Sequence, residues 1–256
     1  MDSALNRAVF KLPRNGTSSS SVNTASATNL VSGVAFTPAV GSLLVALVYG
    51  AVTTDAPSGW TLPTGGSAVN NGGAYLFYRT ANGSSASFAL SHGSPNYPIM
   101  VAVYEFPAGS QFLTAAAETN LEATDPNPQL TGLTGSTLGL AMKGGVLGDG
   151  LNERTVTWAG ATSDFVISEA FAVTDGFAVS VGFAQLTTAT WQPTGLMDPA
   201  GGATREGITL ALRVNNPTPP GGSPVKAWRN GQYVDCDVYG WNGTQYVPVD
   251  VAQGLG

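Results

Sequence analysis

Short hydrophobic runs alternate along the chain with clusters of glycine, proline, asparagine and serine. Leu43–Tyr49 is a nearly continuous apolar run, which is the pattern of a strand that is covered on both faces. The runs Ala74–Thr80 and Ser85–Leu90 flank Asn82-Gly83. This dipeptide favours a hairpin, because both residues tolerate positive φ. No segment has a sustained 3.6-residue period, so the pattern predicts strands rather than helices.

The second half of the chain repeats this style, with about nine to twelve predicted strands in all at regular spacing. Such spacing favours an all-β fold, with a β-sandwich or jelly-roll-like body, over an alternating β/α fold. The other runs that predict strands are Trp60–Leu62, Ile99–Phe106, Thr137–Met142, Arg154–Trp158, Phe165–Ser168, Phe177–Ala184 and Gly207–Val214.

Two polar stretches organise the chain into parts. Residues 16–28 are rich in hydroxyl groups and fit either a flexible tether or a polar edge strand. Residues 215–224 contain four prolines, which cannot donate ladder hydrogen bonds and favour extended conformations. We therefore predict a β-sandwich body (1–214), a proline and glycine linker (215–224) and a small tail of tandem β-hairpins (225–256).

The tail contains an internal repeat with an offset of thirteen residues. Trp228–Val238 and Trp241–Val251 are identical at six of eleven positions, and each unit has an Asn-Gly dipeptide between a Trp and a Tyr-Val pair. A short hairpin with this spacing places aromatic residues on one cross-strand face. Two hairpins of this size bury too little to be stable alone. We expect the tail to pair with another copy or to dock on a neighbouring protein, with Trp228, Tyr233, Trp241 and Tyr246 as contacts.

Composition excludes several classes of protein. Charged residues make up 10% of the chain, against about 25% in typical domains. Serine and threonine together supply 48 residues, so uncharged hydroxyl groups provide much of the polar surface. Disordered chains have low hydrophobicity and high net charge, which this sequence lacks. The net charge is −6 and the ten basic residues are scattered, which argues against binding nucleic acid.

The start of the sequence and its apolar runs bear on where the protein works. Met1–Gly16 is interrupted by charged residues and does not have the pattern of a secretory signal. Leu43–Val52, the longest apolar run, is shorter than the roughly 18 to 20 residues of a membrane-spanning helix. A composition typical of extracellular β proteins, without an export signal, fits a virion component that is assembled in the cytoplasm. An ordinary cytosolic protein is the alternative.

Residues with catalytic potential are few. His92 is the only histidine, and its surroundings lack the Gly-x-Ser-x-Gly motif of serine hydrolases, so we expect an exposed loop residue. Cys236 is the only cysteine, which excludes an intrachain disulfide. Its neighbours Asp235 and Asp237 disfavour a reactive thiolate. The sequence therefore predicts a protein that is not an enzyme.

Carboxylates and tryptophans are the remaining candidates for binding. Glu118, Glu122 and Asp125 form one acidic loop, and Asp149 and Glu153 another; neither has EF-hand spacing, so we interpret both as solvated loops without a metal.

Tryptophan rings can stack on the apolar faces of sugars. Trp60 and Trp191 lie next to turn signals and are candidates for glycan contact, with core packing as the alternative for Trp60 and for Trp158.

One set of motifs resembles a known family. Pro57–Leu62 (PSGWTL) is followed by Gly73–Gly83 (GAYLFYRTANG) and by Val101–Phe106, which ends in Tyr-Glu-Phe. This spacing of turns and aromatic residues resembles the minor tail proteins of actinobacterial siphophages, and Trp241–Val249 is similar to short terminal hairpins in such proteins. The resemblance extends over roughly half of the chain. It implies a structural or host-contact protein of the virion, often oligomeric, and brings no catalytic residues.

The sequence and the resemblance together predict a structural protein of a bacteriophage virion. We expect a minor tail protein that contributes to the tail tip or fibre and to host attachment. The expected partners are further copies of itself, with a trimer as the default, other tail or capsid proteins and host-envelope glycan; no cofactor, nucleic acid or membrane insertion is expected. The alternatives are a head-decoration protein of the capsid and a carbohydrate-binding module without catalysis.

Overall fold

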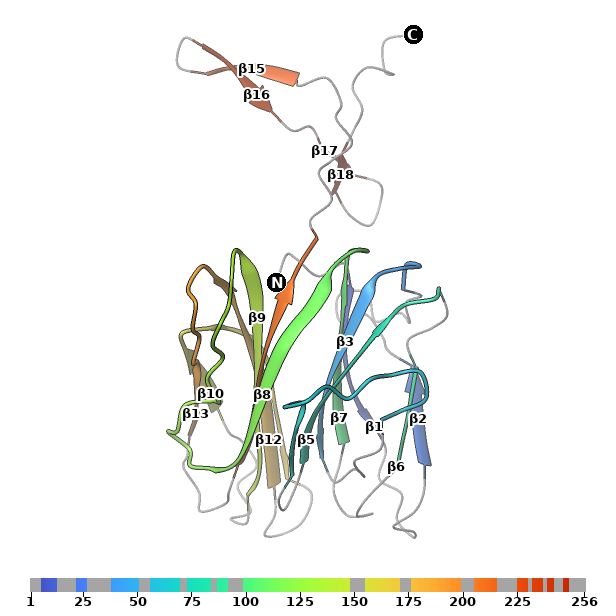
Figure 1. Ribbon diagram of the computed structural model, residues 1–256, viewed down its shortest axis with the longest axis vertical. Coiled ribbons are helices and arrows are strands. Elements are labelled where there is room, and N and C mark those ends of the chain that lie inside the picture. Colours follow the sequence, from blue (N-terminus) through green and yellow to red (C-terminus); the bar gives the residue numbers. More distant parts are fainter. Residues whose placement is uncertain are drawn as a thin grey trace. The chain divides into compact units, whose positions relative to one another are not determined.

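The computed structural model consists of strands and contains no helix in the part of the chain that it describes (Figure 1). The chain divides into two compact units, Met1–Asn215 and Asn216–Gly256, which we call the body and the tail. This division falls one residue beyond the predicted end of the body at residue 214. The described residues are 6–12, 22–26, 38–50, 56–69, 73–83, 87–91, 99–147, 155–170, 176–198, 205–215, 225–229, 232–236, 239–241 and 246–248.

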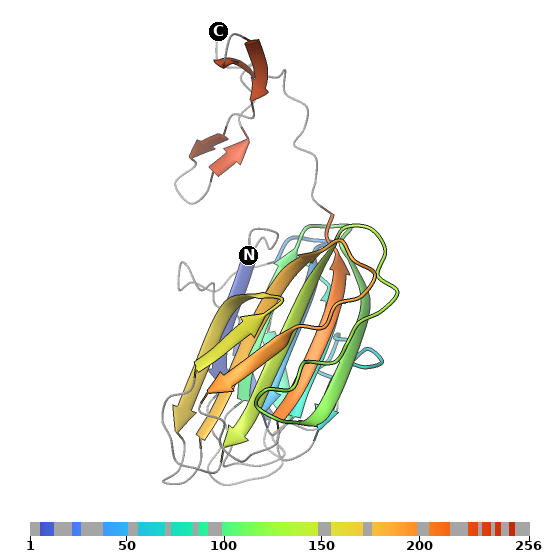
Figure 2. The same ribbon diagram turned by 90° about the vertical axis from the view of Figure 1, so that its left-hand side faces the viewer.

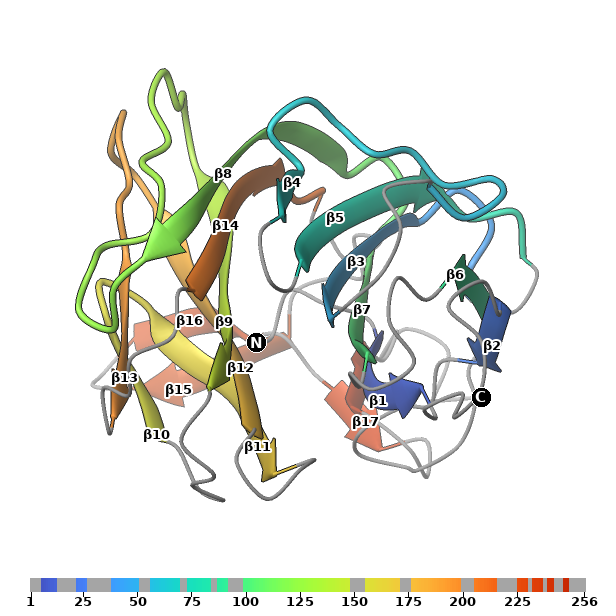
Figure 3. The ribbon, with the colours of Figure 1, turned by 90° about the horizontal axis from the view of Figure 1, so that it is seen from below.

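Two five-stranded antiparallel sheets form the body, and they face each other (Figure 3). The first sheet has the order β1-β7-β3-β5-β4 and the second the order β11-β12-β9-β14-β8. The strands of the first sheet are β1 (Asn6–Leu12), β3 (Leu43–Gly50), β4 (Ser67–Val69), β5 (Gly73–Thr80) and β7 (Ile99–Phe106). Those of the second sheet are β8 (Gln111–Leu121), β9 (Thr137–Leu147), β11 (Thr162–Ala170), β12 (Gly176–Leu186) and β14 (Arg205–Arg213).

This arrangement confirms the predicted all-β fold with a sandwich-like body. It does not confirm the jelly-roll variant, because each sheet takes its described strands from one continuous half of the chain. In a jelly roll the chain crosses between the two sheets repeatedly. Here one connection, Pro107–Ser110 between β7 and β8, joins the two sheets.

The two sheets share one topology. When the five strands of each sheet are counted in chain order, both sheets have the order first, fifth, second, fourth, third. Trp60 and Trp158 occupy the same place in this scheme, between the second and third strands, and each packs on the outer face of its sheet. The body is therefore built from one five-stranded unit used twice.

Shorter antiparallel pairs complete the structure. The pair β10–β13 lies over the second sheet on the side away from the first sheet, and it faces the viewer in Figure 2. Part of the polar stretch 16–28 is a strand, β2, that pairs with β6. The pairs are β2 (Val22–Ser26) with β6 (Ser87–Ser91), β10 (Thr155–Ala159) with β13 (Thr194–Asp198), β15 (Val225–Arg229) with β16 (Gln232–Cys236), and β17 (Tyr239–Trp241) with β18 (Tyr246–Pro248).

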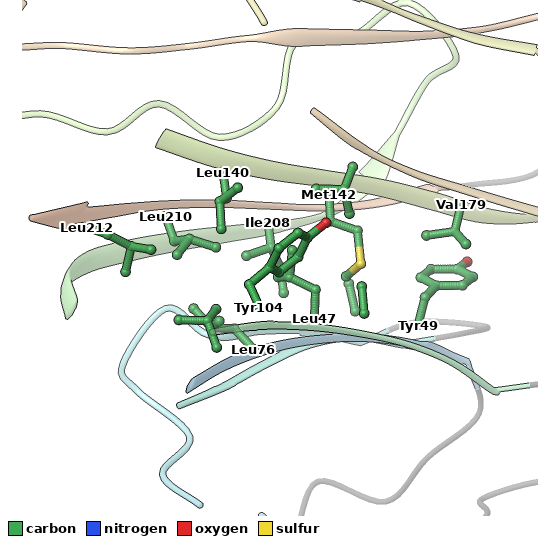
Figure 4. Close-up of a cluster of buried hydrophobic side chains, with 14 of the residues drawn as sticks. Leu47, Tyr49, Leu76, Tyr104, Leu140, Met142, Val179, Ile208, Leu210 and Leu212 are labelled. Carbon is green, nitrogen blue, oxygen red and sulfur yellow. The ribbon is translucent and has the colours of Figure 1, made fainter. Parts of the chain in front are cut away.

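The main core lies between the two sheets (Figure 4). Alternate residues of each strand point inward, as the two-residue period of a strand requires. Leu47 and Leu76 of the first sheet meet Leu140, Ile208 and Leu210 of the second, and all five side chains are buried. Because β3 is buried along its whole length, its other face is also covered, which explains why its sequence is continuously apolar rather than alternating.

Two polar contacts cross this apolar core. The Tyr49 hydroxyl donates a hydrogen bond to Glu206 Oε2 over 2.9 Å, and both residues are buried. The Tyr104 hydroxyl donates to Asp164 Oδ2 over 2.9 Å. Hydrogen bonds to a charged acceptor contribute about 1.5 to 3 kcal/mol each. They also fix how one sheet is positioned against the other, which apolar contacts alone do less strictly.

Gly144 makes room for the first of these contacts. A Cβ atom at this position would lie 2.5 Å from Tyr49 Cε2, which is closer than side-chain atoms approach one another. Gly144 is paired with Glu206 in the β9–β14 ladder, so the Tyr49 ring packs against the backbone beside the carboxylate that it binds. Glycine at 144 is therefore a requirement of the contact between the sheets.

The structure differs from the sequence-based prediction at several places. The runs that flank Asn82-Gly83 do not form a hairpin with each other, because β5 pairs with β3 and β4, and β6 pairs with β2. The strands β1, β4 and β13 are also not among the predicted strands. The pattern predicts a strand at Trp60–Leu62, but Thr61 makes only an isolated bridge with Tyr78. The eleven-residue strand β8 is not among the predicted strands, because Gln111–Leu121 contains three consecutive alanines, which have low β-propensity. Its pairing with β14 imposes the strand.

We predict that Gly144→Ala destabilises the body by about 1 to 3 kcal/mol, because the added methyl group overpacks the core against Tyr49. Urea unfolding followed by tryptophan fluorescence measures this change. The double variant Gly144→Ala/Tyr49→Leu is the control: the smaller side chain leaves space for the methyl group, so the double variant should lose less stability than the sum of the two single variants. Strict additivity, or a Gly144→Ala protein as stable as the wild type, would contradict the role of Gly144.

Candidate functional site

Both tryptophans that are candidates for glycan contact are buried. The exposed fraction is 6% for Trp60 and 8% for Trp191. The Arg79 guanidinium lies over the Trp60 ring, 5.0 Å from its centroid. Trp191 Nε1 donates a hydrogen bond to the carbonyl oxygen of Gly160 over 2.9 Å. Neither ring presents a free face for stacking on a sugar, so the structure gives the glycan contact no support at these positions.

Glycines on the second sheet create the space for an outer layer of tryptophans. A Cβ atom at Gly139 would lie 2.5 Å from Trp191 Cζ3, and one at Gly182 would lie 2.7 Å from Trp158 Cδ2. The rings therefore lie flat on the sheet. Trp158 Nε1 also donates to Ser180 Oγ over 2.9 Å, so the polar atom of this ring is bonded as well. Trp158 and Trp191 form part of a second apolar cluster on the outer face of this sheet.

A buried lysine lies beneath the same layer. The side chain of Lys143 is 0% exposed, and its Nζ donates to the carbonyl oxygens of Asp125 over 2.7 Å and Ala123 over 3.3 Å. Burial lowers the pKa of Lys143 to about 8, with a further lowering by the charge of Arg205 and a partial compensation by Asp125. Arg205 is 1% exposed and its Nε contacts Met197 Sδ.

Asn127 fastens the segment that covers Lys143. Its Nδ2 donates to the carbonyl oxygen of Met142 over 2.9 Å and approaches that of Ile208 at 3.4 Å, which lie on β9 and β14. Its backbone amide donates to the carbonyl oxygen of Pro193 over 2.8 Å. Lys143 and Asn127 together hold the connection between β8 and β9 onto the second sheet. Both side chains are fully buried, so their function here is to position the backbone.

The acidic loop before β9 uses its carboxylate locally. Asp125 Oδ2 accepts a hydrogen bond from the Glu122 amide over 2.8 Å, which stabilises a turn. In the described part of the chain, no three histidine, cysteine, aspartate or glutamate residues are grouped so that they could hold a metal. The other candidates from the sequence, His92, Asp149 and Glu153, lie outside the described residues.

The tail has the predicted hairpins. Trp228 lies directly opposite Tyr233 in β15–β16, and Trp241 lies directly opposite Tyr246 in β17–β18. The sequence repeat is therefore also a structural repeat, with the same cross-strand pair in each hairpin. That these four residues contact another copy or a neighbouring protein stays a prediction.

Sequence reasoning missed the polar residues of the core. Lys143 directly follows the apolar run Leu138–Met142, and Glu206, with Arg205 before it, directly precedes the predicted strand Gly207–Val214. Charged residues are almost never fully buried unless they are paired. A single charge at the end of a strand that is predicted to be buried is the signal that could have located them.

We predict that Lys143 makes stability depend on pH between about 8 and 10.5. The pKa of Lys143 is about 8 in the folded protein, against 10.5 for an ordinary exposed lysine. The unfolded chain thus binds more protons in this window, so the free energy of unfolding rises with pH. Relative to Lys143→Met, the wild type should gain up to about 3 kcal/mol from pH 8 to pH 10.5.

Urea unfolding of both proteins across this range measures the difference. Titration of the tyrosines contributes to both curves and cancels when they are subtracted. Lys143→Arg is the control, because arginine stays charged in this range and should give no such pH-dependent difference. Parallel curves for the wild type and Lys143→Met would contradict a lowered pKa of Lys143.

Comparison with known proteins gives no relative. No family model matches the chain, and neither a curated protein nor a solved structure is similar to it at a significant level. Among the described residues there is also no helix of the length and hydropathy needed to cross a membrane. The functional interpretation therefore depends on the residues and their geometry.

Proposed function

We propose that this chain is a structural protein of a bacteriophage virion, specifically a minor tail protein that contributes to the tail tip or fibre and to contact with the host envelope. The observation that carries the proposal is how the body uses polar side chains in its interior, of which Glu206 and Lys143 are buried and Asp164 is half-buried. Glu206, Asp164 and Lys143 are each bonded across sheets or layers of the body. Their chemistry stabilises the fold.

The resemblance to siphophage minor tail proteins supports this proposal. Its motifs occupy structural positions in the body: Trp60 lies on the outer face of the first sheet, Tyr75 and Phe77 stack on β5, and Tyr104 and Phe106 stack on β7. Trp60, Tyr75 and Phe77 thus pack on the outer face of the first sheet, and Tyr104 and Phe106 pack in the core between the sheets. A rigid body of this kind suits a particle that must survive outside the cell.

The division of the chain supports it further. A stable body is joined through a proline-rich segment to a tail of repeated short hairpins. The low density of charge leaves a surface of hydroxyl and amide groups. In an assembly with many copies, weak individual contacts with an envelope are strengthened by avidity. A head-decoration protein would have the same requirements but a different location.

We expect antibodies raised against the purified protein to label the tails of phage particles. Electron microscopy with gold-labelled antibody, together with mass spectrometry of purified particles, measures this. Antibody that has been pre-adsorbed with the purified protein is the control. Labelling of the head shell would replace the tail assignment by the decoration alternative, and absence of the chain from purified particles would contradict the proposed function.

A further inference from the structure

Both faces of the first tail hairpin carry apolar positions. Successive residues of a strand alternate between the two faces, and residues directly opposite each other share a face. The register of β15–β16 therefore assigns each cross-strand pair to one face. The pairs on one face are Trp228–Tyr233 and Lys226–Asp235, and those on the other are Val225–Cys236, Ala227–Val234 and Arg229–Gln232.

The tail has few means of stabilising itself. A two-stranded hairpin is marginally stable at best in water. Small units usually add disulfides, a structural metal or oligomerisation. The chain has one cysteine, Cys236, so no disulfide can form within the tail, and the only histidine, His92, lies in the body. Structural zinc sites are built mainly from cysteine and histidine. Association with another folded surface remains as a means of stabilising the hairpins.

The repeat favours a second copy of the chain as the partner. A repeated unit that cannot bury its apolar face alone is stabilised by stacking on like units, and about three or more are needed. The residues of the tail contain two such units, with Trp opposite Tyr at the same place in each. A second copy of the chain supplies further hairpins with the same Trp–Tyr register. An unrelated protein does not supply such hairpins.

The distribution of charge agrees with contact between tails. The tail contains Lys226, Arg229, Asp235, Asp237 and Asp250, which give a net charge of −1. The rest of the chain therefore carries −5 of the total of −6. Lys226 and Asp235 also lie opposite each other in the register. Copies of this chain repel one another mainly through their bodies, and the tail is the part where they can approach at little electrostatic cost.

We propose that the hairpins β15–β16 and β17–β18 are a self-association element, in which the Trp–Tyr faces of two or more copies pack together and fold on contact. This inference rests on the assembly role proposed above, which it deepens by naming the partner as the tail of a second copy. It concerns the chain in solution and can be tested without the virion.

The first test measures hydrogen exchange of the full-length chain at a series of protein concentrations. If the tails fold on one another, the amides of residues 225–248 become at least about tenfold more protected from low to high micromolar concentration, while those of the body do not change. Light scattering should show the molar mass rising over the same range. Tail protection that is independent of concentration, in a monomer, would overturn the proposal, because the tail would then fold alone or on its own body.

The second test uses the double variant Trp228→Ala/Trp241→Ala. Aromatic anchors dominate the binding energy of most interfaces, so we expect the association constant to fall by at least about tenfold. The matched control is Gln232→Ala/Gln245→Ala, which changes the repeated residue beside each tyrosine and should leave association within about threefold of the wild type. Equal association of both variants and the wild type would overturn the assignment of the aromatic face.

The two proposals fail in different ways. A chain that remains monomeric but labels phage tails would contradict self-association and leave the virion function standing. A chain that associates through its tails but is absent from purified particles would do the reverse.

Discussion

The hydrogen bond between Tyr49 and Glu206 sets the geometry on which the body depends. It joins the second strand of one sheet to the fifth strand of the other through an apolar core. Burying a carboxylate is unfavourable in free energy unless it accepts hydrogen bonds. A shift of one sheet against the other would break this hydrogen bond and leave the Glu206 carboxylate buried without it. Gly144 allows the ring to approach, because glycine alone leaves the space that the ring occupies. Apolar packing supplies most of the stability, and this contact specifies one relative position of the sheets.

The same principle recurs in the layer outside the second sheet. Lys143 binds backbone carbonyl groups of the covering segment, and Asn127 binds those of the sheet. Trp158 and Trp191 lie over glycines and bond their indole nitrogens to Ser180 and to Gly160. Each of these four side chains thus connects two segments that are separated in the sequence. Such contacts restrict movement between layers, which would suit the virion role proposed above.

Much of the fold could be predicted from the sequence, because burial on both faces leaves a direct pattern. Leu43–Tyr49 is continuously apolar and Ile99–Phe106 is apolar except for Glu105, and these runs are the interior strands β3 and β7. The edge strand β8 could not be predicted in this way, because its residues are half-buried and its strand conformation comes from pairing with β14. The sequence also did not predict that the two sheets share one topology. The topology depends on which strands pair, and few identical residues in the two halves of the chain indicate it.

The candidate site residues show the same difference between what local sequence predicts and what depends on contacts between distant segments. The Trp and Tyr register of the tail follows from local spacing and could be read from the repeat. The burial of Trp60 and Trp191 depends on which residues lie beneath them, and for Trp191 this is Gly139 on a distant strand. Contacts between distant segments are the feature that a single sequence predicts least well.

The separation of the two sheets along the chain has a consequence for synthesis. The first sheet is complete in hydrogen bonds once residue 106 has left the ribosome, whereas the second requires residue 213. At typical translation rates the interval is about 5 to 20 seconds. During this time the second sheet does not yet cover the leucines that will line the interior, so the nascent chain exposes a broad apolar surface. Such a partly synthesised chain is a suitable substrate for ribosome-associated chaperones.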